Sequence, residues 1–370
     1  TSWSSKPIVC NKATYAPHYY SRDGYAALGA VNATSGVAGA ASGNRLPATF
    51  RLGGGSITWT FGTQEPWEIY LMPARSLAEG TGAYYGLIGA PAVPPRYAFG
   101  FMASRWGWKG KQDVVDTMAK FREGRFPIDA VICDFEWFTK ENDYAFAPSR
   151  GEPWYTDFGF NDAFWGGGGD TLKKALSGLR RDQQVRYGGI RKPRLGNQAL
   201  IDMARSKNWI SPVPQPGGTY PPLYDQSYAQ GRGLNFSQAA VRQWYAGEMA
   251  HFVDDGVDFW WNDEGESDYF TFHWWNEAEV EASRSSKPMK RFFSLNRAFT
   301  PGMARLGATV WTGDIDPTWA DLKGTPGLML NWGLAGAPYV ACDIGGFAGQ
   351  TTPELLTRWM QMGAFMPLMH

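Results

Sequence analysis

Residues 256–267, GVDFWWNDEGES, contain an apolar run that ends directly in acidic residues. Residues 257–262 have the aromatic-rich pattern that is typical of a buried strand. The acids Asp263, Glu264 and Glu266 follow at once. In a parallel β/α fold, the residues that follow a strand lie at the edge of the sheet where active sites form. We therefore interpret this stretch as a strand that leads carboxylates into a site.

The chain after about residue 96 alternates between strand-like apolar runs and segments with helical spacing. The helical segments include 111–124, 237–256 and 352–365. Repeated alternation of this kind predicts a parallel β/α fold. Because about eight strands are reached by the end of the chain, we predict a (β/α)8 TIM barrel over 96–370, with its last strand incomplete. A doubly wound open sheet is the alternative.

Residues 1–95 have a different pattern, in which short apolar runs alternate with Gly, Ser, Asn and Pro. This pattern predicts a β-rich region, part of a β-sandwich, before the barrel. The pair Pro94–Pro95 marks the expected boundary. Within the barrel, the polar, Gly-rich stretch around 139–195 is predicted to be a loop insertion, and its basic run 180–194 a solvated loop.

The composition excludes several classes of function. Lys+Arg and Asp+Glu balance at 35 each, which argues against nucleic acid or an anionic membrane as the main partner. No apolar stretch is long enough for a membrane span. Three Cys and four His are too few for a disulfide scaffold or a His-rich metal site. The 18 Trp suit a large core, and they also suit stacking on sugar rings.

Acidic residues follow four of the predicted strands: Asp134, Asp263, Asp314 and Asp343. A closed barrel directs all these strand ends toward one mouth. Glycoside hydrolysis requires two carboxyl groups beside the scissile bond, one ionised and one protonated, and it needs no cofactor. The competing interpretation is a Ca²⁺ or Mg²⁺ site formed by Asp263, Glu264 and Glu266.

Four stretches together resemble glycoside hydrolase family 31, the α-glucosidase family. The first is VPPRYAFGFMASRWGW at 93–108, and the second is the stretch at 256–267. The third, at 297–322, runs from Arg297 through Trp-Thr-Gly-Asp to a further Trp. The fourth is DIGGFAGQTTPELLTRWMQMGAFMPL at 343–368.

The resemblance implies a role for each matching residue. Asp263 matches the catalytic nucleophile, Asp314 the general acid/base, and Glu266 a supporting acid. The resemblance also implies a group of substrate-binding and pocket residues: Asp134, Arg297, Trp261, Trp311, Trp137 and Asp343, the last in a mainly structural role.

Three features depart from the family pattern. The nucleophile is usually followed by Met-Asn-Glu-Pro, whereas Glu264, Gly265, Glu266 and Ser267 stand here. The segment from Arg297 to Asp314 is one residue longer than the commonest spacing, and Trp137 stands where many α-glucosidases have Tyr. The family's sugar-binding His would lie about two residues beyond His370.

These observations predict a retaining, exo-acting α-glycosidase, and specifically an α-glucosidase, that acts on an α-linked oligosaccharide or glycoside. An α-transglucosylase or an α-glucan lyase on the same site is the alternative within this chemistry. The alternative of another class is a non-catalytic carbohydrate-binding or structural module. Sequons at Asn32 and Asn235 predict N-glycans and a secreted or endomembrane-lumenal protein.

Overall fold

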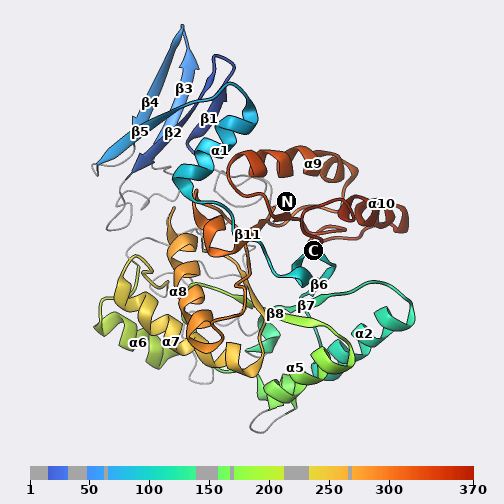
Figure 1. Cartoon of the computed structure of the whole chain (residues 1–370). Coiled ribbons are helices and arrows are strands. Elements are labelled where there is room, and N and C mark those ends of the chain that lie inside the picture. Colours follow the sequence, from blue (N-terminus) through green and yellow to red (C-terminus); the bar gives the residue numbers. More distant parts are fainter. Residues whose placement is uncertain are drawn as a thin grey trace.

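The computed structural model describes seven stretches of the chain: residues 16–31, 48–61, 66–138, 157–166, 171–211, 233–265 and 269–370. A small β-rich region packs against one side of a larger α/β region (Figure 1).

The N-terminal region is β-rich, as predicted. One antiparallel sheet has the order β1-β2-β5, and a separate hairpin is formed by β3 and β4. The strands are β1 (His18–Ser21), β2 (Tyr25–Val31), β3 (Ala48–Gly53), β4 (Ser56–Phe61) and β5 (Trp67–Pro73).

A helix in this region, α1 (Leu77–Ile88), was not predicted from the sequence. It begins at Ser76, whose side chain accepts a hydrogen bond from the backbone N–H of Glu79. Tyr84 and Ile88 of α1 pack against the sheet in a small core with Ala26, Leu28 and Met72. Three glycines in LAEGTGAYYGLI obscure the helical pattern, and packing against the sheet adds to the N-cap in stabilising this helix.

The larger region contains a seven-stranded parallel sheet in the order β12-β11-β10-β9-β8-β7-β6. Its strands are β6 (Met102–Arg105), β7 (Ala130–Cys133), β8 (Arg186–Arg191), β9 (Phe259–Asn262), β10 (Ser294–Asn296), β11 (Ala308–Trp311) and β12 (Val340–Ala341). Consecutive strands are neighbours, and each pair is parallel. This is the strand order of a TIM barrel.

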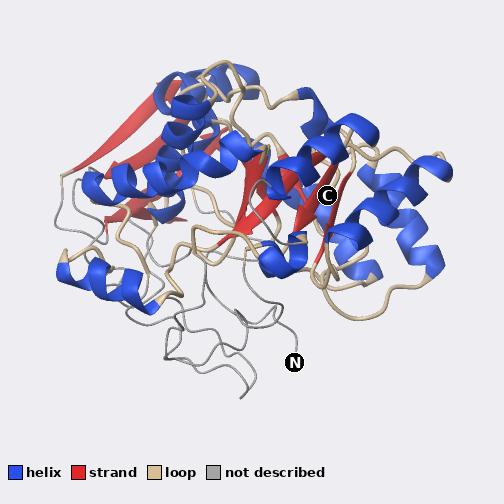
Figure 2. Ribbon diagram, turned by 90° about the horizontal axis from the view of Figure 1, so that it is seen from below, coloured by secondary structure: helices blue, strands red, loops and turns tan. Residues whose placement is uncertain are grey.

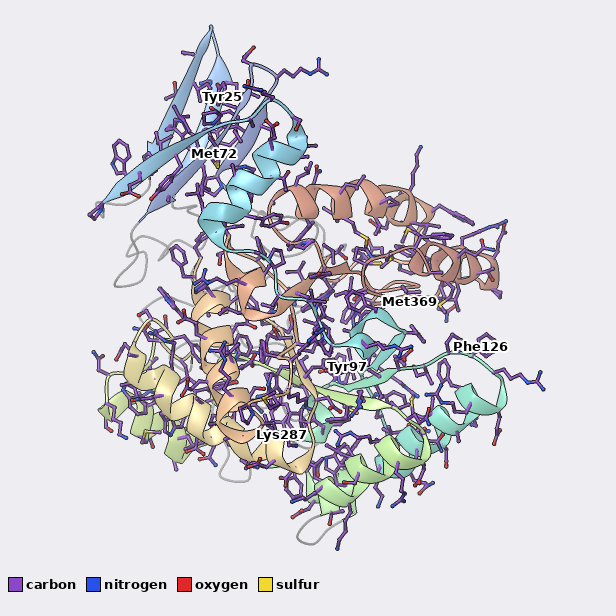
Figure 3. The ribbon with its side chains drawn as sticks, viewed as in Figure 1. Tyr25, Met72, Tyr97, Phe126, Lys287 and Met369 are labelled. Carbon is purple, nitrogen blue, oxygen red and sulfur yellow. The ribbon has the colours of Figure 1, made fainter. Side chains whose placement is uncertain are left out.

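Residues 368–370 close the sheet between its two edge strands. Phe101 forms a parallel bridge with Met369, which is labelled in Figure 3, and the N–H of Met102 donates to the carbonyl of Met369 at 2.9 Å. On the other side, the N–H of Leu368 donates to the carbonyl of Val340 at 3.3 Å. The predicted TIM barrel is therefore confirmed, and an open sheet is excluded.

Helices surround the parallel sheet (Figure 2). They are α2 (Lys111–Glu123), α4 (Asp162–Trp165), α5 (Thr171–Asp182), α6 (Gln198–Ser206), α7 (Ala239–Asp255), α8 (Thr271–Ser286), α9 (Trp319–Leu334) and α10 (Pro353–Gly363). Short 3-10 turns add η3 (Arg96–Phe99), η4 (Phe135–Trp137) and η6 (Met303–Leu306). In the described stretches, no helix has the length and apolar character that crossing a lipid bilayer requires.

The prediction that the whole of 139–195 is a loop insertion was wrong for its second half. Residues 171–182 form α5, and residues 186–191 form β8, which lies between β7 and β9. The strand RYGGIR was missed because it contains two glycines and begins and ends with Arg. A Cβ at Gly188 would lie 2.4 Å from Phe259, and one at Gly189 would lie 2.6 Å from Trp137. The glycines are therefore required by close packing.

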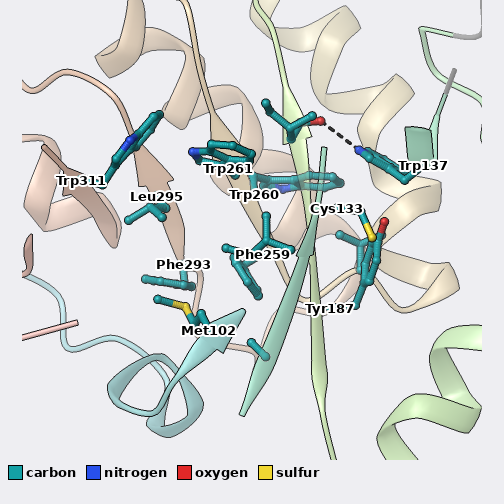
Figure 4. Packing of buried hydrophobic residues seen from close by; sticks show 14 of the residues in the cluster. Met102, Cys133, Trp137, Tyr187, Phe259, Trp260, Trp261, Phe293, Leu295 and Trp311 are labelled. Carbon is teal, nitrogen blue, oxygen red and sulfur yellow. Dashed lines mark hydrogen bonds between the residues drawn. The ribbon is translucent and has the colours of Figure 1, made fainter. Parts of the chain in front are cut away.

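Aromatic side chains fill the barrel. β7, β9, β10 and β11 are buried along their whole length. The fully buried indoles are Trp137, Trp165, Trp260, Trp275, Trp311, Trp332 and Trp359. Figure 4 labels three of them, Trp137, Trp260 and Trp311. Much of the high Trp content therefore serves core packing, the first of the two uses expected for it.

Candidate active site

Charged residues directly follow the strands at one end of the barrel. They are Asp134 after β7, Lys192 after β8, Asp263 after β9, Arg297 after β10 and Asp314 shortly after β11. The strands are parallel and adjacent, so these residues meet at the same mouth, as the sequence predicted for the acids.

Asp263 is buried and both of its carboxylate oxygens have partners. Oδ1 accepts from the Arg297 Nη1 at 2.6 Å and from the backbone N–H of Glu264 at 2.8 Å. Oδ2 forms an ion pair with the ammonium of Lys192. Burial by itself raises the pKa of Asp263, but the charges of Lys192 and Arg297 outweigh it and hold this pKa below its usual value. Asp263 is therefore ionised at neutral pH.

Arg297 connects the two predicted catalytic acids. Its Nη2 lies 3.2 Å from Oδ2 of Asp314, while its Nη1 binds Asp263. Burial raises the pKa of Asp314; Arg297 opposes this shift, and the neighbouring charge of Asp263 adds to it. The two carboxyls thus have pKa values displaced in opposite directions, which is the pattern of a general acid beside an ionised nucleophile.

Two basic residues of this site were missed from the sequence. Lys192 and Arg194 belong to the basic run that was predicted to be a solvated loop, and that prediction was wrong for both. Their side chains are only 2% and 7% exposed. Lys192 pairs with Asp263 and also lies 3.3 Å from Glu264, and Arg194 lies 2.5 Å from Glu264. The acid-rich sequence after Asp263 was the available signal, since buried acids require cationic partners.

Asp134 lies at the same mouth and is 4% exposed. Its carboxylate accepts a hydrogen bond from the N–H of Phe135 at 2.8 Å, which caps the turn η4. Burial raises the pKa of Asp134 well above its usual value, although Lys192 lowers it. Nearby, Oε1 of Glu136 accepts from the N–H groups of Gly107 and Trp108, and so fixes the loop after β6.

Trp137 occupies a different environment from the one predicted. Its indole is completely buried, and its Nε1 donates to the carbonyl of Ile190 at 3.1 Å (Figure 4). Its ring packs edge to face on Tyr187 and Phe252. This placement argues against direct contact between Trp137 and a substrate, because the ring already has a full set of core neighbours.

Trp261 and Trp311 lie side by side on β9 and β11, with ring centroids 5.5 Å apart. The ring of His370 lies 6.0 Å from that of Trp261. His370 is also close to Asp343, with Nδ1 to Oδ1 at 3.9 Å. Burial raises the pKa of Asp343 well above its usual value and lowers that of His370 to about 4. His370 therefore belongs to this mouth, although it was not among the predicted site residues.

Two predicted residues, Glu266 and the sequon residue Asn32, lie outside the described residues. The other sequon residue, Asn235, is half-buried, and its side-chain oxygen accepts from the hydroxyl of Ser237 at 2.6 Å. Where the chain is described, no three His, Cys, Asp or Glu side chains are grouped so that they could hold a metal ion.

The family model for the glycosyl hydrolases family 31 TIM-barrel domain matches residues 91–370. The chain belongs to glycosyl hydrolases family 31. Membership agrees with the resemblance found in the sequence and with the closed barrel.

The relatives include several α-glucosidases. The chain is 26% identical over 339 residues to neutral alpha-glucosidase AB from Homo sapiens, which covers 81% of this chain and 33% of that protein. It is 25% identical over 334 residues to alpha-glucosidase 2 from Bacillus thermoamyloliquefaciens, covering 77% of this chain and 37% of the relative. The chain thus spans about a third of the length of these relatives.

Solved structures of glycosidases share the fold. A xylosidase from Aspergillus niger superimposes with a TM-score of 0.76 at 15% identity, covering 98% of this chain and 54% of the other. A family 31 alpha-glucosidase from Bacteroides thetaiotaomicron gives a TM-score of 0.74 at 21% identity, covering 96% and 58%. At these identities the likeness concerns the fold alone.

Proposed function

We propose that this chain forms the catalytic core of a retaining, exo-acting α-glycosidase, with α-glucosides as its substrates. The observation on which the proposal rests is the bridge from one guanidinium, that of Arg297, to Asp263 on one side and Asp314 on the other. Retaining glycosidases need two carboxyls about 5–5.5 Å apart, and a shared guanidinium keeps such a pair close.

Asp263 acts as the nucleophile because two cations keep its buried carboxylate ionised. Its oxygen bonds to the anomeric carbon, while the glycosidic bond breaks and the leaving oxygen takes a proton from Asp314. Asp314 then removes a proton from water, which attacks the same carbon and releases Asp263. The raised pKa of Asp314 supports the proton-donating role.

The other acids and aromatics bind the sugar in this proposal. Asp134 and Arg297 hold hydroxyls of the terminal residue, and Trp261 and Trp311 form the apolar side of the pocket. The identity of the sugar is supported by the names of the relatives, which are α-glucosidases. A secreted or lumenal location and glycans at Asn32 and Asn235 are further proposals that rest on the sequons.

The test is covalent trapping in the full-length protein. A panel of aryl α-glycosides identifies the preferred sugar, and a 5-fluoro-α-glucosyl fluoride labels the nucleophile, which peptide mass mapping then locates. We expect the label on Asp263 and loss of turnover in Asp263→Asn. Asp254→Asn, a change at an exposed position on α7, is the control and keeps full activity. A folded protein that binds sugar but shows neither label nor turnover would instead be a non-catalytic module.

A further inference from the structure

Lys192 and Asp263 leave neighbouring strands at the same level. β8 and β9 are paired so that Arg191 lies opposite Asn262, and the N–H of Asp263 donates to the carbonyl of Arg191 at 3.0 Å. The next residue on each strand therefore enters the mouth beside the other. The backbone register, and not a flexible side chain alone, brings the ammonium to the carboxylate.

The ammonium of Lys192 is enclosed. The side chain is 2% exposed, and Nζ lies 4.8 Å from the centre of the Phe135 ring. Besides Asp263, the acid within ion-pair distance is Glu264, whose Oε1 is 3.3 Å from Nζ, and the charge of Asp134 also acts on Lys192. A buried ammonium is costly without an anionic partner, and Asp263 and Glu264 are the two carboxylates that form ion pairs with Lys192.

Glu264 has a backbone conformation that is unusual for a residue with a side chain. Its φ is 54°, in the left-handed region. The conformation is held by the Arg194 contact at 2.5 Å and by the N–H that Glu264 donates to Asp263. It places the Glu264 carboxylate beside Lys192, where it is a second acceptor for the same ammonium.

We propose that Lys192 is a positioning residue that stabilises the free carboxylate of Asp263, and that Glu264 takes over the ammonium while Asp263 is bonded to the sugar. The proposal rests on the function proposed above. It adds that one cation, Lys192, is shared by the nucleophile Asp263 and by the next residue, Glu264.

The charges balance through both chemical steps. When Asp263 bonds to the anomeric carbon, its negative charge is lost and the electron pair of the broken bond leaves with the protonated aglycone. The ammonium then pairs with Glu264. When water attacks, the ester bond breaks and its electron pair returns to Asp263, which again binds Lys192. By stabilising the free carboxylate, Lys192 thus speeds the second step, in which Asp263 is the leaving group. It does not speed the first step, in which Asp263 is the nucleophile.

Replacing Lys192 with Met should slow the release of Asp263 from the covalent intermediate without slowing its formation. Without the cation, Asp263 is a better nucleophile but a poorer leaving group, so the covalent intermediate accumulates on aryl glycosides. We expect kcat to fall at least about tenfold with a matching fall in KM, and kcat/KM to stay within about threefold. Lys192→Arg should retain the wild-type pattern, and Lys323→Met, at an exposed position on α9, is the control.

Glu264→Gln should shift the pKa of Asp263 in the direction opposite to the shift caused by Lys192→Met. The charged groups that face Asp263 from the surrounding elements are Asp134, Lys192, Glu264, Arg297, Asp314 and Asp343. Among them Lys192 lowers the pKa of Asp263 and Glu264 raises it. The acidic limb of the kcat/KM profile should therefore move to higher pH in Lys192→Met and to lower pH in Glu264→Gln.

A merely structural role would lower kcat and kcat/KM together and leave the acidic limb in place in both variants, and that result would overturn the proposal. Thermal unfolding of each variant establishes that it is folded. If the wild type is labelled on Asp263 but the variants show no such separation, only the role of Lys192 fails. If the wild type carries no label, the proposed function itself fails.

Discussion

At the scale of single residues, the environment of each carboxyl decides its role. Asp263 and Asp314 are the same residue type, but Asp263 is buried and Asp314 is partly buried. Asp263 contacts two cations, Lys192 and Arg297. Asp314 forms an ion pair with the other terminal nitrogen of Arg297, and the negative charge of Asp263 raises its pKa. One pKa is lowered and the other raised, so the two groups hold different protonation states over a common range of pH.

Asp314→Ala tests the acid/base role directly. We expect kcat/KM for glycosides with poor leaving groups to fall by about 10²–10⁴-fold, because the leaving oxygen then departs unprotonated. Dinitrophenyl glycosides, which need no proton, should lose far less in the first step. Steady-state kinetics on both substrate types gives the comparison.

The same variant should change the pH profile. In the wild type, we expect activity to fall at low pH as Asp263 is protonated, at a pKa below the usual aspartate value. We also expect activity to fall at higher pH as Asp314 loses its proton, at a pKa above that value. Asp314→Ala should lose the alkaline limb and keep the acidic one. An alkaline limb that survives would assign the proton to another group.

At the scale of secondary-structure elements, a buried polar network holds the strand ends in register. Asn262 at the end of β9 donates to Glu279 of α8 at 2.8 Å and to Asn296 of β10 at 3.1 Å. Asn276 of α8 also donates to Asn296, at 2.7 Å. Asn262 and Asn296 directly precede Asp263 and Arg297 in the sequence, so the network helps to set the positions of both site residues.

Glu279→Gln should make stability less dependent on pH. Burial raises the pKa of Glu279 from 4.5 to about 8, against the opposing effects of Asn262 and Arg191. Between these values the unfolded chain ionises Glu279 while the folded protein keeps it protonated, so the free energy of unfolding falls as pH rises. The variant removes this loss, about 1–3 kcal/mol near pH 7.

Denaturant unfolding at several pH values measures this effect. Glu281→Gln, an exposed position on the same helix, should keep the wild-type dependence. An unchanged slope in Glu279→Gln would mean that Glu279 is ionised in the folded protein.

Gly189→Ala tests why β8 contains glycines. The added Cβ would lie 2.6 Å from the indole of Trp137, so the strand or the ring must move. We expect a loss of about 1–3 kcal/mol in the free energy of unfolding. Gly247→Ala on α7 meets nothing within 4 Å and should instead stabilise by about 0.5–1 kcal/mol. Equal effects at the two positions would contradict the packing argument.

At the scale of the whole molecule, α1 joins the N-terminal sheet to the barrel (Figure 1). The Tyr84 hydroxyl donates to the carbonyl of Ala335 at 2.9 Å, and this bond is buried. The Tyr20 hydroxyl donates to the carbonyl of Leu334 at 3.2 Å. A Cβ at Gly336 would lie 2.7 Å from Ile88, which indicates that the two regions are closely packed here.

Tyr84→Phe should weaken this junction. Loss of a buried hydrogen bond costs about 0.5–1.5 kcal/mol, and the Ala335 carbonyl is left unsatisfied. Thermal unfolding and limited proteolysis between the two regions measure the change. Tyr85→Phe is the matched control, because its hydroxyl lies 3.5 Å from the carbonyl of Gly333 and should contribute little. A larger loss of stability in Tyr85→Phe than in Tyr84→Phe would mean that the Tyr84 hydrogen bond is not the main contact at this junction.

The sequence by itself determined the fold class and the family. Apolar strands such as 257–262 alternate with helices, and this local pattern is sufficient to predict a parallel barrel. The acids Asp134, Asp263 and Asp314 come directly or shortly after strands, which is sufficient to predict where the candidate site lies. Motif order then sufficed to identify family 31. The domain boundary at Pro94–Pro95 and the role of Glu266 stay predictions.

Only the tertiary structure decided which charges meet. Lys192 and Arg194 resembled part of a solvated loop because the strand before them, β8, contains Gly188 and Gly189. The need for those glycines is apparent only from their close contact with Phe259 and Trp137. Trp137 resembled a pocket residue, yet its ring is enclosed by side chains distant in sequence. Local pattern records the periodicity of one element, whereas burial and ion pairing depend on neighbours that the chain brings together only when the barrel closes.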